Sequence, residues 1–160
     1  MSGSENSCEC GANLTCLLGG KVAVKTLPIT KDYLDERRWM TEKGEMAQIA
    51  NSADEAFRHL MYWDLKPDGA NAIRGQHYHK RKVENLYLLA GRVELSVQDL
   101  QSQEATSVIL AAGTKVSIAP ECAHAYRALE YSQALEFHAE RYDESDTFRF
   151  DVPERAKQLP

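Results

Sequence analysis

Gly75-Gln76-His77-Tyr78-His79-Lys80-Arg81-Lys82-Val83-Glu84 is the segment with the strongest structural signal in the chain. His77 and His79 are separated by one residue in a strand-like segment, so both imidazoles are expected on the same face of that strand. Glu84 begins the next strand-like run. A tight connection between the two strands can bring its carboxylate beside the two rings. The spacing therefore predicts a cluster of metal-ligating side chains on one side of a β-structure.

His124 lies 40 residues after Glu84 and is the candidate for a fourth ligand. An adjacent strand, reached after the turn at Gly113, can supply it. Imidazoles together with one carboxylate suit divalent transition metals such as iron, manganese, nickel, cobalt or zinc. The predicted ligands of such an ion are His77, His79, Glu84 and His124. The other two histidines, His59 and His138, do not join the pattern and are expected to be ordinary surface or core residues.

Short runs of alternating apolar and polar residues surround this stretch. The clearest is a hairpin in which residues 84–90 are apolar, Gly91 breaks the run, and residues 93–97 then alternate. Further strand-like runs occupy residues 21–27, 38–42, 60–65, 108–110, 115–118, 123–129 and 133–139. Turn signals recur without any long helical periodicity, so the chain is predicted to be an all-β sandwich or barrel.

The length and composition fit one globular domain. The chain has 160 residues, of which 43% are hydrophobic and 27% charged, and this supply of apolar side chains can fill one core. Residues 1–20 are rich in Ser, Gly and Asn and predict a flexible N-terminal arm. Residues 21–152 are predicted to form the single barrel domain, and residues 153–160 a C-terminal tail.

Charge and cysteine content narrow the class of protein. The formal net charge of −5 argues against nucleic-acid binding, because phosphate backbones recruit basic surfaces. No stretch approaches the roughly 18–20 apolar residues of a membrane span, and no secretory signal or nucleotide-cofactor motif is visible. Cys8, Cys10 and Cys16 match no closed zinc-binding pattern, so they are expected to be incidental reduced thiols of a cytoplasmic protein.

Two motifs resemble those of the cupin superfamily. Residues 75–91 are similar to its first motif. Residues 113–124 are similar to its second motif, although only three residues separate Pro120 from His124 and the usual glycine between them is missing. The resemblance implies a double-stranded β-helix, which is also called a jelly roll or cupin barrel. It gives the role of metal ligand to His77, His79, Glu84 and His124.

A narrower resemblance points to dTDP-4-dehydrorhamnose 3,5-epimerases. Asp35–Glu42 is similar to their early Asp-x-Arg-Gly-aromatic segment, and Ile73–Tyr78 to their Arg-Gly-x-His-Tyr segment. Pro120–Ala125 resembles their Pro-Glu-Gly-aromatic-Ala-His-Gly segment with one residue missing. Glu140–Glu144 lies where that family carries its catalytic tyrosine. The order of these matches along the chain gives them more weight than any one of them has alone.

The related sugar-nucleotide 3,4-ketoisomerases share the pattern Arg-Gly-x-His-x-His-Lys, which is Arg74–Lys80 here, and a tail much like Tyr142–Asp146. Both resemblances imply a small-molecule isomerase or epimerase that acts on a nucleotide-linked keto sugar. Such a reaction needs a base to remove a proton from carbon and an acid to return one. His77 is the expected base, and either Tyr142 or Tyr126 the acid.

Basic residues near the motif are expected to hold the diphosphate, since a guanidinium pairs bidentately with phosphate oxygens. The residues assigned to substrate binding are Arg74, Arg38 and Lys80. The run Lys80–Lys82 adds local positive charge to an acidic protein, and its alternative interpretation is a solvated loop.

The two resemblances conflict at His77, because a histidine that coordinates a metal cannot also act freely as a base. The epimerases work without metal and lack the second histidine, whereas this chain has every cupin ligand type. Two alternative functions therefore stay open: a metal-dependent enzyme such as an oxygenase, and a non-catalytic sensor or ligand-binding module. Cys122 is expected to be a small buried thiol. A homodimer is expected as well, since small cupin barrels commonly dimerise through apolar edge strands.

Overall fold

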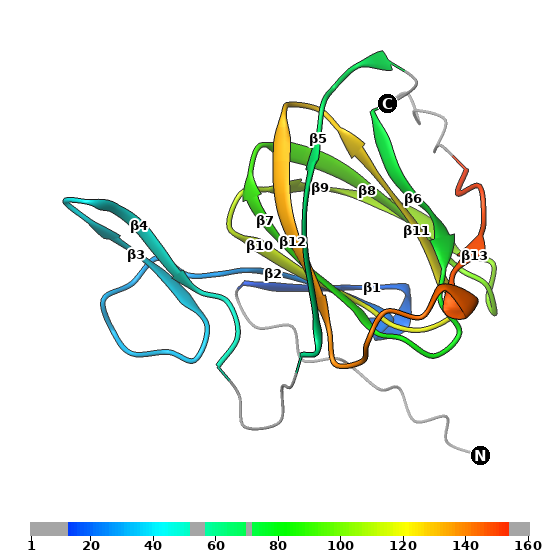
Figure 1. Ribbon diagram of the computed structural model, residues 1–160, viewed down its shortest axis with the longest axis horizontal. Helices are drawn as coiled ribbons and strands as arrows, with labels where there is room; N and C mark the ends of the chain where they lie inside the picture. The colour runs from blue at the N-terminus through cyan, green and yellow to red at the C-terminus, as the bar shows by residue number, and fades with distance from the viewer. Residues whose placement is uncertain (1–12, 52–56, 70–71, 154–160) are drawn as a thin grey trace.

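The computed structural model describes residues 13–51, 57–69 and 72–153, and antiparallel strands dominate this part of the chain (Figure 1). A six-stranded sheet has the order β1 (Leu14–Leu17), β2 (Val22–Thr26), β10 (Thr114–Ile118), β7 (Glu84–Ala90), β12 (Ser132–His138), β5 (His59–Leu65). A five-stranded sheet has the order β13 (Phe148–Arg149), β6 (Ile73–Tyr78), β11 (Cys122–Ala128), β8 (Arg92–Asp99), β9 (Ala105–Ala111).

The two sheets face each other and enclose the core, as Figure 1 shows. From β5 to β8, and again from β9 to β13, successive strands alternate between the two sheets, whereas β1 and β2 are neighbours in one sheet and β8 and β9 in the other. In the six-stranded sheet β7 lies between β10 and β12, and in the five-stranded sheet β11 lies between β6 and β8. This arrangement is an all-β jelly roll, the double-stranded β-helix that the two motifs imply. The prediction of the fold class is confirmed.

The core comes from residues that alternate along the central strands. Val93, Leu95 and Val97 of β8 are completely buried, and so are Leu86 and Leu88 of β7. Successive side chains of a strand point to opposite faces, so these residues project between the sheets while their neighbours face outward. Burial of such side chains contributes about 1.5–3 kcal/mol each to folding. The alternation that predicted the hairpin therefore also builds the core.

The N-terminal boundary of the barrel differs from the prediction. Leu14–Leu17 was assigned to a flexible arm, but it forms β1 and pairs in antiparallel register with β2, after which η1 (Leu18–Gly20) makes the turn. Leu17 and Leu18 also pack against the core. An edge strand needs only one backbone partner and a few apolar contacts, so its short sequence carries a weak signal. Cys8 and Cys10 lie outside the described residues.

A second hairpin projects away from the barrel (Figure 1). It consists of β3 (Arg37–Thr41) and β4 (Gly44–Gln48), which form a separate two-stranded sheet, and Arg38 of β3 also bridges to Ile29. At the other end of the chain, the short turn η3 (Glu144–Asp146) precedes β13. Within the described ranges, none of the helical segments has the length or apolar character that crossing a bilayer requires.

Candidate metal centre and active site

A β-bulge in β6 places His77 directly opposite His124. Gly75 pairs with Ala125 and His77 with His124, so that Gln76 is the extra residue on its strand. Gly75 and Gln76 both have positive φ angles, +89° and +57°. A Cβ atom at position 75 would lie 2.8 Å from the His124 carbonyl oxygen, so only glycine fits there. The glycine of the motif therefore sets the register that brings the two histidines together.

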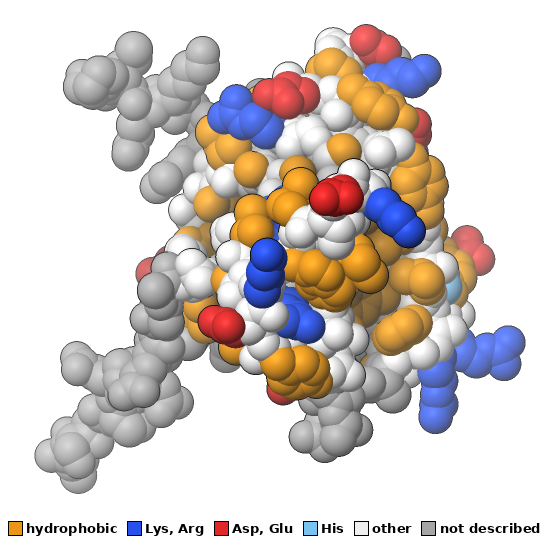
Figure 2. Space-filling model, turned by 90° about the vertical axis from the view of Figure 1, so that its left-hand side faces the viewer, with side chains coloured by type: hydrophobic (Ala, Val, Ile, Leu, Met, Phe, Trp, Pro, Cys, Tyr) orange, Lys and Arg blue, Asp and Glu red, His pale blue; other side chains and the backbone are white. Residues whose placement is uncertain are grey.

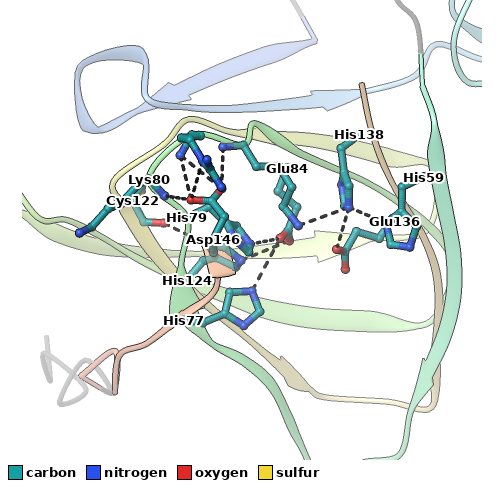
Figure 3. Close-up of polar contacts among 12 residues, drawn as sticks. His59, His77, His79, Lys80, Glu84, Cys122, His124, Glu136, His138 and Asp146 are labelled. Atoms are coloured by element: carbon teal, nitrogen blue, oxygen red, sulfur yellow. Dashed lines mark hydrogen bonds and ion pairs between the residues drawn. The ribbon is translucent and has the colours of Figure 1, made fainter. Parts of the chain in front are cut away.

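Glu84 is the centre of the histidine cluster (Figure 3). Its Oε2 atom lies 3.1 Å from Nε2 of His79 and 3.7 Å from Nε2 of His77. Its Oε1 atom lies 3.2 Å from Nε2 of His124. One possible ligand atom from each residue lies within 4.8 Å of those of the other three. The structure thus brings all four predicted ligands into one site. His77 comes from β6, His79 from the segment just after it, Glu84 from the start of β7 and His124 from β11.

Backbone carbonyls fix the tautomers of two of these histidines. Nδ1 of His79 lies 2.7 Å from the Asp146 carbonyl oxygen, and Nδ1 of His124 lies 3.1 Å from that of Cys122. A carbonyl oxygen only accepts hydrogen bonds, so each Nδ1 carries the proton and donates it. In the neutral rings, Nε2 of His79 and of His124 then presents a lone pair to the carboxylate of Glu84. This arrangement is typical of metal-ligating histidines, in which the second nitrogen is held by a carbonyl.

The charges of the cluster are coupled. Burial alone would raise the pKa of Glu84, but the positive charge that His124 carries when it is protonated, together with the close contacts of the three imidazoles, outweighs burial and holds the pKa well below its usual range. Burial likewise would lower the pKa of His124, and the charge of Glu84 reverses this and raises it. Burial dominates at His77 and lowers its pKa. The cluster therefore contains a carboxylate and a neutral His77 at neutral pH.

The donor set fits a divalent metal ion. Nε2 of His77 and Nε2 of His124 are buried without a hydrogen-bond partner among the described residues. Lone pairs that converge on a carboxylate repel it unless a cation or a proton lies between them. Three imidazole nitrogens and one carboxylate form a ligand set that first-row transition metals favour. His77, His79, Glu84 and His124 could therefore hold such an ion.

Asp146 supports the cluster from outside. Its carboxylate accepts hydrogen bonds from the backbone N–H groups of Lys80 at 3.0 Å, of Arg81 at 3.2 Å and of Lys82 at 3.1 Å. These bonds outweigh the effect of burial and lower the pKa of Asp146. The residue thereby holds the turn between β6 and β7, the turn that sets Glu84 beside the histidines. The resemblance of Tyr142–Asp146 to the C-terminal segment of the 3,4-ketoisomerases indicated no role for Asp146.

The two candidate acids lie in different places. The Tyr126 ring centroid is 6.0 Å from that of His124, and its hydroxyl is buried with no hydrogen-bond partner in the described part of the chain. Burial, followed by the charge of Glu84, raises the pKa of Tyr126 well above its usual range. Tyr142 is 59% exposed, and its ring centroid is 5.8 Å from that of His59. Tyr126 is therefore the tyrosine that the fold places beside the histidine cluster.

The predicted substrate-binding residues separate in the structure. Arg74 pairs with Tyr126 across the strands and crosses to β5, where its Nε donates to the Asp64 carbonyl oxygen at 3.0 Å. Lys80 points its ammonium group at the Phe148 ring, 4.5 Å from the centroid. Arg38 belongs to the projecting hairpin, where its Nε bonds to Glu45. Of the three, Arg74 shares its sheet face with Tyr126, while Arg38 is engaged within the hairpin.

The predicted role of Cys122 as a buried thiol agrees with the structure. Its side chain is 1% exposed and belongs to the hydrophobic core. Burial raises the pKa of this thiol to about 11, so it is protonated at neutral pH. A protonated thiol is neither a good metal ligand nor a good nucleophile.

A second polar group, which the motifs did not indicate, lies inside the barrel. It contains His59 from β5 and Glu136 and His138 from β12 (Figure 3). Lys82, from the turn before β7, reaches the same group. Nδ1 of His59 lies 2.7 Å from Nε2 of His138, and Nζ of Lys82 lies 3.3 Å from the same atom. Only the strand register reveals this group, because β5 and β12 pair with His59 opposite His138.

Comparisons with known proteins support the fold. No protein-family model and no curated protein matches the sequence. The sugar 3,4-ketoisomerase QdtA from Thermoanaerobacterium thermosaccharolyticum, solved in complex with TDP, is 21% identical with a TM-score of 0.63, over 81% of this chain and 88% of that chain. A 3,4-ketoisomerase from Helicobacter canadensis is 20% identical with a TM-score of 0.63, over 80% and 90%.

The 3,5-epimerases give the same result. The dTDP-6-deoxy-D-glucose-3,5-epimerase RmlC from Legionella pneumophila, in complex with dTDP-4-keto-L-rhamnose, is 16% identical with a TM-score of 0.65, over 86% of this chain and 76% of that chain. At such identities the likeness concerns the fold. The chain therefore has the cupin jelly-roll fold of the sugar-nucleotide 3,4-ketoisomerases and 3,5-epimerases, the type that its motifs resemble.

Proposed function

We propose that the chain is an isomerase or epimerase that acts on a nucleotide-linked keto sugar. The exposure of His77 is the observation that carries this assignment. Its side chain is 26% exposed, whereas those of His79, Glu84 and His124 are 5%, 2% and 1% exposed. His77 is thus the member of the cluster that a molecule entering from solvent can reach. The shared fold with enzymes solved in complex with TDP or a TDP-linked keto sugar supports the same substrate class.

Proton transfer beside a ketone suits the residues around His77. Burial lowers the pKa of His77, so its imidazole is neutral and can accept a proton at neutral pH. Tyr126 keeps its proton because burial raises its pKa, and its hydroxyl can donate that proton to carbon or oxygen. Arg74 is exposed and donates its Nε–H group to the Asp64 carbonyl oxygen, and the terminal N–H groups of a guanidinium suit phosphate oxygens.

We further propose that the cluster binds a divalent transition metal. When both rings are neutral, the tautomers of His79 and His124 direct two lone pairs toward Glu84, and a cation between them would take the place of a proton on His124. Catalytic metal sites commonly use three protein ligands and keep a further position open. His79, Glu84 and His124 can supply those three, which leaves His77 free as the base and removes the conflict between the two roles. A bound ion would polarise the keto oxygen as a Lewis acid.

Deuterium incorporation tests the proposed reaction. The purified protein is incubated in D2O with dTDP-linked and UDP-linked 4-keto sugars, and NMR follows exchange at the carbons beside the ketone. We expect exchange and product formation by the wild type, and neither by His77→Ala. The same sugar nucleotides should raise the Tm of the wild type, and Arg74→Ala should abolish that shift. No exchange and no stabilisation with any of these compounds would refute the assignment.

A metal-dependent enzyme of another reaction class, such as an oxygenase, is the second candidate, and the same tautomers favour it. Metal analysis of the protein as purified, alongside His79→Ala, separates the two assignments. A loaded metal without any reaction of keto sugars would favour the second candidate. A metal-free protein that isomerises keto sugars would exclude it. Binding of a sugar nucleotide without turnover would instead indicate the non-catalytic binding module.

We also propose that the protein is a cytoplasmic homodimer. An apolar groove of about 350 Å³ opens on the outer face of the six-stranded sheet, lined in part by Ile49, Phe57, Leu60 and Leu135. Met40 and Met46 of the projecting hairpin are 56% and 52% exposed. Figure 2 shows hydrophobic side chains gathered on this side of the molecule. A second copy would bury both features, and sedimentation of the full chain measures the oligomeric state.

A further inference from the structure

The ammonium group of Lys82 contacts the pair formed by His59 and His138. Nε2 of His138 lies 2.7 Å from Nδ1 of His59 and 3.3 Å from Nζ of Lys82. The Glu136 Oε1 atom lies 4.0 Å from Nε2, beyond hydrogen-bond reach. A lysine ammonium has three donors and no acceptor. Nε2 of His138 must therefore be an acceptor, and its proton resides on Nδ1.

This order of donors also fixes the state of His59. Because Nε2 of His138 accepts, Nδ1 of His59 must carry a proton and donate it. The other nitrogen of His59, Nε2, is then left with a lone pair in the neutral ring. A histidine whose first nitrogen is oriented by a hydrogen bond and whose second bears a lone pair has the arrangement of a general base.

His138 is suited to hold His59 in this state. It is 1% exposed, and burial, followed by the charge of Lys82, lowers its pKa to about 4, against a smaller opposing effect of Glu84. His138 thus remains neutral and keeps accepting from His59 throughout the neutral range.

The location of His59 complements that of His77. Figure 3 shows the two residues on opposite sides of Glu84, with His77 on β6 and His59 on β5. Both are partly exposed, unlike His138. The Tyr142 ring lies 5.8 Å from that of His59, which puts the second candidate acid on this side as well. A ligand that contacts both His77 and His59 would meet two separate proton-transfer groups.

On the basis of the function proposed above, we propose that His59 is a second catalytic residue that transfers protons at the substrate oxygens, with His138 and Lys82 as positioning residues. A keto–hydroxyl exchange between neighbouring carbons requires such a group. One C–H bond breaks at the hydroxyl-bearing carbon and one forms at the former carbonyl carbon. One O–H bond breaks at the old hydroxyl and one forms at the old carbonyl oxygen. His77 serves the carbons, His59 moves the proton between the oxygens, and no oxidant or net proton is consumed.

Chemical rescue tests this assignment. The full-length wild type, His59→Ala, His59→Gln and the matched control Tyr62→Phe are compared with the keto-sugar nucleotide that the wild type turns over. Tyr62 lies on the same strand and is 53% exposed, and its hydroxyl accepts a hydrogen bond from the Gln133 side chain. We expect kcat of His59→Ala to fall by about 100-fold or more, which is the usual contribution of an acid–base group, with little change in KM. Added imidazole should restore much of this loss, and Tyr62→Phe should retain wild-type turnover.

The outcomes separate the two proposals. A wild type that converts no keto-sugar nucleotide overturns the proposed function and this role of His59 together. An active wild type with a fully active His59→Ala, or with a loss that imidazole does not restore in either folded variant, overturns the role of His59 alone. If His59→Ala fails to fold, His59→Gln carries the kinetic comparison. Nitrogen NMR of the histidine rings gives an independent check, since a proton on Nε2 of His59 in the resting wild type would also overturn the assignment.

Discussion

Nδ1 of His79 donates a hydrogen bond to the backbone carbonyl oxygen of Asp146 at 2.7 Å, across 67 residues of sequence. The carboxylate of the same Asp146 accepts from the turn that follows His79. One residue near the end of the barrel therefore fixes both the tautomer of a candidate ligand and the turn that leads to Glu84. The geometry of the cluster depends on a segment far from the motif that predicts it.

Replacement of Asp146 by alanine should loosen this end of the barrel. The carboxylate accepts from the N–H groups of Lys80, Arg81 and Lys82, and its loss leaves them unpaired or poorly hydrated. We expect the free energy of unfolding to fall by about 3 kcal/mol, since hydrogen bonds to a charged group are worth about 1.5–3 kcal/mol. Urea denaturation measures the change.

Asp143→Ala is the matched control for that variant. Asp143 lies in the same segment and also bonds to Arg81, but it is exposed. We expect its unfolding midpoint to shift far less than that of Asp146→Ala. Equal shifts would show that the segment is not anchored through the Asp146 carboxylate. If the cluster binds metal, Asp146→Ala should also weaken binding by about 10–100-fold, as loss of outer partners does at other sites.

Gly75→Ala should disturb the register of the site. The added Cβ would meet the His124 carbonyl oxygen at 2.8 Å, and the backbone φ of +89° disfavours any side chain. We expect a loss of more than about 2 kcal/mol, because a close contact adds to the usual penalty of a left-handed residue. Gly69→Ala is the control: its φ is +57° and nothing lies within 4 Å of the new Cβ. It should cost only about 1 kcal/mol. Equal losses in the two variants would contradict the role of the bulge.

Local patterns predicted the fold most directly where a strand is buried on one face only. Val93, Leu95 and Val97 of β8 alternate with less buried neighbours, and that alternation is visible in the sequence. β7 is instead a nearly continuous apolar run, because Tyr87 between Leu86 and Leu88 is buried as well. β1 was missed because pairing with β2 satisfies its backbone without requiring a distinctive side-chain pattern. The projecting strand β4 was missed for a similar reason: four of its five residues are exposed, so burial imposes no pattern on them.

The site was predicted only as far as spacing can reach. His77, His79 and Glu84 are close in sequence, and the strand period puts them together. His59 and His138 were given no role because they do not join the motif; 79 residues separate them, and only the pairing of β5 with β12 makes them neighbours. Lys82 belongs to a basic run that was weighed as a phosphate site or a solvated loop, yet its side chain reaches His138. Such pairings follow from topology, which no local pattern encodes.

Glu136→Gln should make the protein more stable at alkaline pH. Burial, and next the charge of Glu84, raises the pKa of Glu136 to about 7, from an ordinary value of 4.5. A raised carboxyl pKa means that the folded state holds the proton more tightly, so its stabilising effect is complete below pH 4.5 and is lost as the pH rises through 7. We expect Glu136→Gln to gain on the order of 2 kcal/mol relative to wild type at pH 8, and little near pH 4.

The contribution of His138 to the free energy of unfolding depends on pH in the opposite direction from that of Glu136. Its pKa is lowered from 6.5 to about 4, so its contribution to stability is present above pH 6.5 and is lost as the pH falls toward 4. Between pH 4.5 and 6.5 the two slopes oppose each other, and the wild type should show a flat profile there. Thermal unfolding from pH 4 to 9 should reveal the His138 slope alone in Glu136→Gln. A profile parallel to that of the wild type would show that Glu136 titrates normally.

Tyr126→Phe distinguishes the two tyrosines as catalytic acids. The Tyr126 hydroxyl is buried and has no hydrogen-bond partner among the described residues, so its removal should cost no stability and can even raise the Tm. Its ring centroid is 6.0 Å from that of His124, so loss of the hydroxyl should still reduce turnover of a keto-sugar nucleotide by about 100-fold or more if it supplies the proton. Tyr142→Phe, beside His59, should have the smaller effect. The reverse order of activities, measured with both variants folded and equally saturated, would assign the acid to Tyr142 and place the reacting carbon on the His59 side of Glu84.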